Sequence, residues 1–384
     1  MKVFVTGLRG IPQVMGGIES HCEELLPRVK LRNRDLDISV LCRAPYFEYG
    51  KKSYRGLSLI PLPSPRSKSL EAIVATFLAT LYAWMRGADV LHIHGIGPAL
   101  LTPLARVLRL KVIVTHHGAD YERAKWGRLA KLILRVGERS GLIWAHQVIA
   151  VSPSLATHLK EIFPSQADKV TYIPNGAPQL RYEGLNARET LERLGLRPGG
   201  YILAVGRLVP EKGLHDLVQA FKASDPSSGL VLAIAGDANH DSEYARELRA
   251  HASDRILFLN FQPRPILKCL YANCSLFVMP SYHEGLPIAA LEAASCAAPM
   301  LLSDIAANRD IGLNEDCYFP VGDTDLLAEL LTADRQPRIV DAHIVKRRFD
   351  WDNSARSTAA LYRSFSPPAR AATPLTHAAS RSGE

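Results

Sequence analysis

Glu284 and Glu292 stand eight residues apart across the predicted start of a helix. The turn Glu284-Gly285-Leu286-Pro287 follows an apolar run, residues 274–279, which predicts a buried strand. Residues 288–296 favour a helix with Pro287 in its first turn. A strand that feeds a helix through a glycine-containing turn points unpaired N–H groups and a positive dipole end at its ligand. The sequence therefore predicts an anion site at this turn.

The two carboxylates indicate which kind of anion could bind at this turn. A carboxylate accepts hydrogen bonds from two or more hydroxyl groups. Two of them beside a phosphate site fit a ligand with hydroxyl-rich groups at both ends, and a nucleoside diphosphate sugar has this layout. The spacing alone is weak evidence, because two solvated glutamates on a helix surface are common, so the interpretation depends on companion motifs.

A pair of cations supplies the first companion motif. The predicted strand 201–205 ends in Gly206-Arg207, and Lys212-Gly213 opens the predicted helix 214–221. Arginine as a planar fork and lysine as a point charge suit a diphosphate. The next predicted strand, 230–235, ends in Gly236, which we expect to line the same site.

A glycine-rich loop near the amino terminus is the second companion motif. The predicted strand 2–6 leads into Gly7-Leu-Arg-Gly10 and then Gly16-Gly17 just before a helix. The spacing is not that of the dinucleotide fingerprint G-x-G-x-x-G, which disfavours a dinucleotide cofactor. A Gly-Gly pair ahead of a helix lets backbone N–H groups approach a diphosphate closely.

The elements that position these motifs alternate between apolar runs and helical segments. This order is typical of a parallel, doubly wound sheet, in which ligands bind beyond the carboxyl ends of the strands. In the first half of the chain the further predicted strands are residues 37–42, 57–61, 89–94, 111–115, 147–151 and 170–174. In the second half they are residues 255–259, 299–303 and 317–320.

Three strand ends carry polar side chains. His92 and His94 lie on one side of their strand by alternation, either as ligands or as hydrogen-bonded interior residues. His117 and Asp120 follow the next strand, where Asp120 could bond an acceptor hydroxyl or a donor sugar. Ser152 is expected to cap a helix. Asn175 precedes Gly176 at the predicted cleft edge, although turn chemistry alone also explains it.

Together these motifs resemble the retaining glycosyltransferases of family four, also called glycosyl transferases group 1, and in particular a bacterial polysaccharide-type subset. The resemblance rests on Glu284-x7-Glu292, Gly206-Arg207-x5-Lys-Gly, Thr115-x-His117 with the following His-Gly-x-Asp…Lys125-Trp126, and Arg9-Gly-Ile-Pro…Gly16-Gly17-x-Glu19. It implies the GT-B fold, in which two Rossmann-like domains face each other across a cleft.

The resemblance also implies roles. His117 would lie near the anomeric carbon of the donor, Glu284 would meet the donor sugar and Glu292 the ribose. Arg207 and Lys212 would stabilise the leaving diphosphate. The expected catalytic residues are thus His117, Arg207, Lys212 and Glu284, and the expected donor-binding residues are Gly16, Gly17, Asp120, Gly236, Gly285, Leu286 and Glu292. With those cations present we expect neither a metal nor another cofactor. Retention of anomeric configuration follows from the resemblance only.

Two positions depart from the family pattern. Asn260-Phe261-Gln262 stands where a glycine is usual near the nucleotide base, so the base stays open, with UDP- or GDP-sugars favoured. Ala297-Ala298-Pro299 replaces the usual Cys/Gly-x-Pro and concerns only the end of the helix.

Length and composition divide the chain. Its 384 residues with 47% apolar content predict two domains. We expect an acceptor-side domain at residues 1–177 and a nucleotide-sugar domain at 178–347. A last helix at 348–365 returns to the first domain, and residues 366–384 have the composition of a disordered tail. The six cysteines show no metal-ligand spacing and are expected to be reduced, cytosolic thiols.

Charge and hydropathy point to a partner. Residues 1–175 carry 24 Lys and Arg against 13 Asp and Glu, a net of +11, whereas the remainder carries −3. We expect no leader, and the apolar segment 70–85 predicts a buried helix too short to span a bilayer. The basic half favours an anionic membrane over nucleic acid, for which no module is present. A basic surface that is merely solvated remains the alternative.

The sequence thus predicts a cytoplasmic enzyme, peripherally bound to the inner face of the cell membrane. It would transfer sugar from a nucleotide-sugar donor to a lipid-linked or polysaccharide acceptor, in bacterial cell-surface or exopolysaccharide biosynthesis. Two alternatives stay open: another GT-B enzyme, such as a nucleotide-sugar epimerase or a phosphorylase, and a non-catalytic sugar-nucleotide-binding protein.

Overall fold

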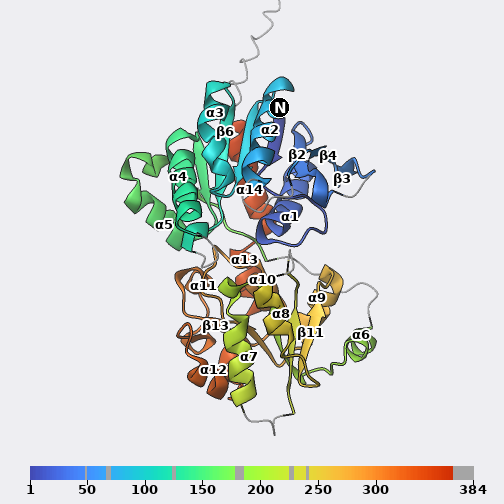
Figure 1. Ribbon diagram of the computed structural model, residues 1–384. Coiled ribbons are helices and arrows are strands. Elements are labelled where there is room, and N and C mark those ends of the chain that lie inside the picture. Colours follow the sequence, from blue (N-terminus) through green and yellow to red (C-terminus); the bar gives the residue numbers. More distant parts are fainter. Residues whose placement is uncertain are drawn as a thin grey trace, which may run out of the picture.

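The computed structural model describes residues 1–47, 50–65, 71–122, 127–177, 186–224, 229–238 and 242–365. Within these residues the chain forms two open sheets, and each sheet carries helices on both faces (Figure 1). The prediction of an α/β fold with two doubly wound, mostly parallel sheets is confirmed.

The first sheet has the order β3-β4-β2-β1-β5-β6-β7-β8, and only β3 runs antiparallel to its neighbour. Its strands are β1 (Lys2–Thr6), β2 (Asp37–Arg43), β3 (Ser53–Tyr54), β4 (Leu57–Leu62), β5 (Val90–His94), β6 (Lys111–His116), β7 (Gln147–Ala150) and β8 (Val170–Tyr172). The sequence did not predict β3, because two residues are too short a run to show alternation.

The helices of the first sheet divide between two apolar cores. One core holds α1 (Gly17–Arg32) and the last helix, α14 (Trp351–Arg363). The other holds α2 (Glu71–Met85), α3 (Thr102–Val107), α4 (Arg128–Trp144) and α5 (Pro153–Ile162). The short 3-10 turns are η1 (Ala44–Tyr46), η2 (Pro98–Leu101), η3 (Asp120–Glu122) and η4 (Pro164–Lys169).

The second sheet has the order β11-β10-β9-β12-β13-β14 and is parallel throughout. Its strands are β9 (Tyr201–Val205), β10 (Val231–Ala235), β11 (Ile256–Asn260), β12 (Leu276–Met279), β13 (Met300–Ser303) and β14 (Tyr318–Phe319). Strand β9 buries four of its five residues. Strands buried on both faces in this way appear as continuous apolar runs in the sequence.

Helices again cover both faces of this sheet. One core includes α6 (Ala187–Arg193), α9 (Arg264–Asn273), α10 (Ile288–Ser295) and α13 (Ala342–Arg348). The other includes α7 (Leu214–Ala223), α8 (Glu243–Arg249) and α12 (Thr324–Leu330). The remaining short elements are α11 (Ala306–Arg309), η5 (Pro210–Lys212), η7 (Glu315–Cys317) and η8 (Gln336–Arg338).

The chain crosses between the sheets twice, and the two crossings bond to each other. The amide of Ala177 donates to the carbonyl of Phe349 at 2.6 Å, and the hydroxyl of Ser354 donates to the carbonyl of Pro174 at 2.8 Å. Helix α14 then packs on α1, as expected for a helix that returns to the first domain. The domain bounds at residues 177, 347 and 365 stay predictions, and the expected disordered tail lies outside the described residues.

The expectation of a buried helix at residues 70–85 needs a correction. Helix α2 buries mainly alanines and threonines, whereas Phe77, Trp84 and Met85 are exposed. Small side chains let the helix lie close to the sheet, so the large ones point outward. Among the described residues no helix is long and apolar enough to cross a membrane. All six cysteines are free.

The crossing generates a stability prediction. A Cβ on Gly176 would lie 2.4 Å from the ring of Trp351, which is 2% exposed. Gly176→Ala should therefore lower the free energy of unfolding by about 1–3 kcal/mol, the usual cost of overpacking. Urea unfolding measures it. Gly17→Ala is the control, because Gly17 is the first residue of α1, has no positive φ, and has no atom of the described residues within 4 Å of its Cβ position. Equal effects of the two changes would contradict the packing argument.

Candidate active site

Two strand ends, one from each sheet, meet backbone to backbone. His117-Gly118 follows β6 and Glu284-Gly285 follows β12. A Cβ on Gly285 would lie 2.1 Å from the carbonyl oxygen of His117, and one on Gly118 would lie 3.2 Å from the Cα of Gly285. Gly118 also has a φ of +115°, which side chains rarely adopt. The approach of the two sheets therefore requires both glycines.

Glu284 is the charged residue at this meeting point. Its Oε1 accepts a hydrogen bond from the Ser281 hydroxyl at 2.7 Å and pairs with Nζ of Lys212 at 2.5 Å. Burial acts to raise the pKa of Glu284, but the charge and hydrogen bond of Lys212 and the Ser281 hydroxyl outweigh it, so the pKa is lowered. Glu284 is thus an ionised carboxylate within the protein.

The predicted cation loop is held against the same strand end. Lys212 ends η5, and Gly213 follows with a φ of +62° and its Cβ position 2.1 Å from the carbonyl oxygen of Pro280. Arg207 follows β9 on the same loop, and its Nη2 lies 3.9 Å from Oε1 of Glu211. The backbone of Gly236 packs on Gly206, since a Cβ there would lie 1.8 Å from the Gly206 carbonyl oxygen.

Glu292 lies deeper, on α10. It is buried and accepts a hydrogen bond from the hydroxyl of Tyr271 at 3.0 Å. Burial raises its pKa, and the charge of Arg264 and the Tyr271 hydrogen bond offset this only in part. Arg264 also pairs with Glu24 of α1, so the same guanidinium connects the environment of Glu292 to the first domain.

Three buried histidines, His21, His92 and His94, lie with the partly buried His117 behind the strand ends of the first sheet. His92 is fully hydrogen-bonded, to the Tyr362 hydroxyl at 2.8 Å and to that of Thr115 at 2.7 Å, which favours the interior interpretation for this residue. Nδ1 of His94 and Nε2 of His117 are 3.0 Å apart and share one hydrogen bond. His21 of α1 packs its ring edge against His117 at 4.8 Å between centroids.

The histidines are neutral. Burial lowers the pKa of His21 to about 4 and that of His92 to about 3, and it holds the pKa values of His94 and His117 well below their ordinary range. His117 therefore offers a neutral imidazole, which can donate one hydrogen bond and accept another but carries no charge.

One link of this layer reaches the second domain. Nδ2 of Asn175 donates to the carbonyl oxygen of Leu286 at 2.7 Å, so its Oδ1 faces His21 Nδ1 at 2.7 Å and receives that N–H. The amide of Asn175 thereby connects α1 to the turn before α10. The side chain of Leu286 itself is buried in the core of the second domain.

Three of the histidines form the set best suited to a metal ion among the described residues. His21, His94 and His117 bring one ring nitrogen each to within 4.8 Å of one another. Zn–N bonds of about 2.0–2.1 Å would hold such nitrogens no more than about 4.2 Å apart. The prediction that no metal is required stays a prediction.

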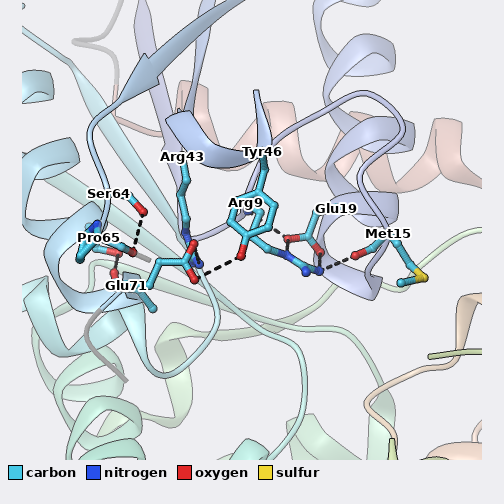
Figure 2. Close-up of polar contacts among 10 residues, drawn as sticks. Arg9, Met15, Glu19, Arg43, Tyr46, Ser64, Pro65 and Glu71 are labelled. Atoms are coloured by element: carbon cyan, nitrogen blue, oxygen red, sulfur yellow. Dashed lines mark hydrogen bonds and ion pairs between the residues drawn. The ribbon is translucent and has the colours of Figure 1, made fainter. Parts of the chain in front are cut away.

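Arg9 organises the glycine-rich loop, as Figure 2 shows. Its Nε pairs with Glu19 Oε1 at 3.1 Å, Nη2 donates to the carbonyl of Met15, and the guanidinium lies 5.5 Å from the centre of the Tyr46 ring. The Tyr46 hydroxyl bonds Glu71 at 3.4 Å. Arg9 and Glu19, which belong to the amino-terminal motif of the family resemblance, thus bind each other and hold the loop.

Four of the predicted site residues meet where the two sheets approach each other: His117, Lys212, Glu284 and Gly285. Gly17, at the start of α1, has open space at its Cβ position. Asp120 is the first residue of η3. Gly16 keeps a φ of +156° beside Glu19. Of the resembling motif after His117, Lys125 and Trp126 lie outside the described residues.

Sequence reasoning missed His21 and Tyr271 as neighbours of the site. One signal was available for His21: it continues the four-residue spacing of Leu25 and Val29 along the apolar face of α1. A polar residue on such a face needs a partner. Tyr271 gave no comparable signal, because an aromatic on a core-facing helix is ordinary.

The depressed pKa of His21 predicts acid sensitivity. Between about pH 6.5 and the folded value of about 4, the unfolded chain binds a proton that the folded chain excludes. The stability from this group is complete above about pH 6.5 and is lost on acidification, at about 1.4 kcal/mol per pH unit. His21→Gln should flatten the fall by that slope. Urea unfolding at several pH values measures it, and parallel curves would contradict it.

Two family models match the chain. The model described as Glycosyltransferase Family 4 matches residues 15–178, and that described as Glycosyl transferases group 1 matches residues 191–333. An uncharacterized glycosyltransferase of Methanocaldococcus jannaschii is 25% identical over 94% of this chain and 98% of its own.

Two further relatives have stated activities. UDP-Gal:alpha-D-GlcNAc-diphosphoundecaprenol alpha-1,3-galactosyltransferase of Escherichia coli is 27% identical over 76% of each chain. GDP-mannose:cellobiosyl-diphosphopolyprenol alpha-mannosyltransferase of Xanthomonas campestris is 27% identical over 78% of each chain.

Solved structures agree on the fold. Sucrose-phosphate synthase of Thermosynechococcus elongatus superposes with a TM-score of 0.79 at 22% identity, over 94% of this chain and 98% of its own. Anabaena HepE in complex with UDP and glucose gives 0.75 at 19% identity, over 95% and 100%. The chain belongs to the glycosyltransferases of family four and group 1, and its two facing sheets form the GT-B fold.

Proposed function

We propose that this chain transfers a sugar, with retention, from a UDP- or GDP-sugar to a hydroxyl of a lipid-linked or polysaccharide acceptor in bacterial cell-surface or exopolysaccharide biosynthesis. The observation that carries the proposal is the ion pair of Lys212 with Glu284 where the strand ends of the two sheets meet. The E. coli and Xanthomonas relatives, whose names state UDP-galactose and GDP-mannose donors and diphosphate-linked lipid acceptors, support the substrate classes.

The ion pair fits a divided role for each partner. A lysine ammonium has three N–H donors, so Lys212 can keep Glu284 and still donate to a phosphate oxygen. Glu284 has a second oxygen, which can accept from a hydroxyl of the donor sugar. Charge that develops on the leaving diphosphate would be stabilised by Lys212, by Arg207 and by the backbone N–H groups at the start of α10.

The other assignments follow the same layout. Glu292 would accept from the ribose, with Tyr271 and Arg264 holding its carboxyl group. Gly16-Gly17 would bring backbone N–H groups from the first domain, so closure of the two domains would complete the site. These groups supply the positive charge that the leaving diphosphate needs, and we propose that no metal is required.

The acceptor places the enzyme at a membrane. A lipid-linked sugar lies at the leaflet surface, and the first 175 residues carry a net charge of +11. Lys and Arg near an anionic leaflet each contribute about 1 kcal/mol of attraction. We therefore propose peripheral binding to the inner face of the cell membrane through the first domain.

A donor panel tests the function. Thermal shift with UDP-, GDP-, ADP- and TDP-sugars should single out one base, because a ligand at 100 times its Kd stabilises by about 2.7 kcal/mol. Nucleotide release should then follow on addition of a lipid-linked acceptor. Binding without release would favour a sugar-nucleotide-binding protein, and a changed sugar without an acceptor would indicate an epimerase.

Lys212→Ala should lower turnover by about two orders of magnitude or more, since removing one preorganised donor costs about 3 kcal/mol of transition-state stabilisation. Lys212 ends the short helix η5, and the change leaves the buried Glu284 without its ion-pair partner, so circular dichroism and thermal unfolding must first establish that the variant is folded. Nucleotide release by the purified variant then measures the turnover. Lys160→Ala, on the exposed face of α5, is the control, and near-normal turnover in Lys212→Ala would remove the diphosphate role.

The two glutamates should differ. Glu284→Gln keeps an acceptor oxygen but loses the charge that pairs with Lys212, so transfer should fall sharply while free nucleotide still binds. Glu292→Gln keeps an acceptor for Tyr271 but should weaken nucleotide binding itself. Calorimetric titration with UDP and GDP, beside a transfer assay, separates the effects. The same defect in both variants would show that the two-ended assignment is wrong.

A further inference from the structure

Helix α4 exposes an unusual number of large apolar side chains. Its buried positions are Gly137, Glu138, Gly141 and Leu142, which turn one narrow face to the sheet. The outward apolar residues recur every three or four positions, with exposed fractions of 71% at Leu129, 57% at Leu132, 44% at Val136, 37% at Ile143 and 47% at Trp144. A surface helix ordinarily turns such residues inward.

Charges of one sign lie between these residues. Arg128, Arg135 and Arg139 are exposed on the same helix. The one carboxylate of α4, Glu138, is buried and bonded to His116 Nε2 at 2.8 Å. The outward face of α4 is therefore apolar and basic, without an acidic residue.

Neighbouring helices continue this surface. Helices α2 and α3 cover the same face of the first sheet as α4, and α3 contacts both (Figure 1). Their exposed large apolar residues are Phe77, Trp84 and Met85 on α2 and Val107 on α3. The one acidic residue of these two helices, Glu71, is buried. We call the outward side of α2, α3 and α4 the docking face.

We propose that α4 lies in the plane of an anionic membrane leaflet, with Leu129, Leu132, Val136 and Ile143 in the acyl boundary and its arginines among the headgroups. The 17-residue helix is about 26 Å long, enough for an interfacial helix. Arginine stems can pack on apolar surface while the charged ends stay at the headgroups, and tryptophan favours the same boundary.

A lipid surface fits this face better than a second copy of the chain. A two-fold pairing of α4 with itself would gather two copies of Arg128, Arg135 and Arg139 in one interface, with no exposed carboxylate on the helix to offset their charge. An anionic bilayer offers an apolar layer and negative charge together.

This inference rests on the proposed function, because it assumes that the acceptor is carried by a membrane. Glu138 on the buried face of α4 binds His116, the residue before His117. Between His117 and α4, Glu122 pairs with His283 of the second domain at 3.0 Å. A leaflet against α4 would thus adjoin the strand ends at the cleft.

Insertion of apolar side chains into the leaflet should change how membrane binding depends on salt concentration. Charge attraction alone would be released when salt shortens the Debye length to about 3 Å at about 1 M. Burial of apolar side chains is not screened, so a bound fraction should survive in high salt.

Vesicle co-sedimentation with the full chain tests the inference, using phosphatidylglycerol–phosphatidylcholine vesicles and phosphatidylcholine vesicles as probes. The double change Leu129→Glu with Leu132→Glu should weaken partitioning onto anionic vesicles by about tenfold or more and abolish the salt-resistant fraction. Ile344→Glu is the matched control, because Ile344 is 53% exposed on α13 of the second domain. Circular dichroism and thermal unfolding establish that each variant is folded.

Two further experiments, one on charge and one on fluorescence, separate the electrostatic from the apolar contribution to membrane binding. Arg128→Gln with Arg139→Gln should reduce the preference for anionic lipid while leaving the salt-resistant fraction. The emission of Trp144 should shift to the blue on vesicle addition and be quenched by brominated lipid, and Trp144→Phe should remove that part of the signal. Trp351, which is buried, should contribute no change.

The proposal is overturned if the wild-type chain ignores anionic vesicles, if the Leu129/Leu132 variant binds them as well as the control does, or if this variant alone converts a dimer to a monomer. The proposed function fails differently: no nucleotide would be released from any donor by any variant, whatever the vesicles show. On a water-soluble acceptor the α4 variants should turn over donor like the wild type, since within the described residues no hydrogen bond or ion pair joins their side chains to the candidate site.

Discussion

The contact of two glycines across the cleft is the constraint on which the site depends. Gly118 and Gly285 place the backbone after β6 against the backbone after β12, and a Cβ on Gly285 would lie 2.1 Å from the carbonyl oxygen of His117. Interior packing has no slack to absorb a clash of that size without moving one sheet relative to the other. The same contact sets where Glu284 lies, because this residue directly precedes Gly285.

Buried charge imposes the next condition. An ionised carboxylate inside a protein is costly unless it is paired and hydrogen-bonded. Glu284 meets the condition with Lys212 and Ser281, and its pKa is lowered. Glu292 accepts a hydrogen bond from the neutral hydroxyl of Tyr271, and burial outweighs this bond and the charge of Arg264, so its pKa is raised. Two carboxylates of one motif thus stand in different electrostatic states, which fits different partners for each.

The layer of histidines shows how the first domain supports this meeting point. His92 bonds Tyr362 of α14, and His21 packs against Trp351 of the same helix at 5.6 Å between ring centroids. The last helix therefore completes a polar interior that the first 177 residues would leave open. Neutral imidazoles suit it, since burial of several charged rings side by side would be strongly unfavourable.

The sequence by itself determined the parallel two-sheet plan and most strand positions to within one or two residues, because buried parallel strands are continuous apolar runs. It also placed His117 just after a strand, Lys212 at the opening of a helix and Glu284 in the turn between a strand and a helix, since glycines mark those turns. Only the tertiary structure decided that Lys212 pairs with Glu284, that Asn175 links His21 to Leu286, and that the apolar face of α4 points outward. Each of these depends on how segments far apart in the chain come together through sheet order and domain contact. Local composition and spacing carry no record of that arrangement.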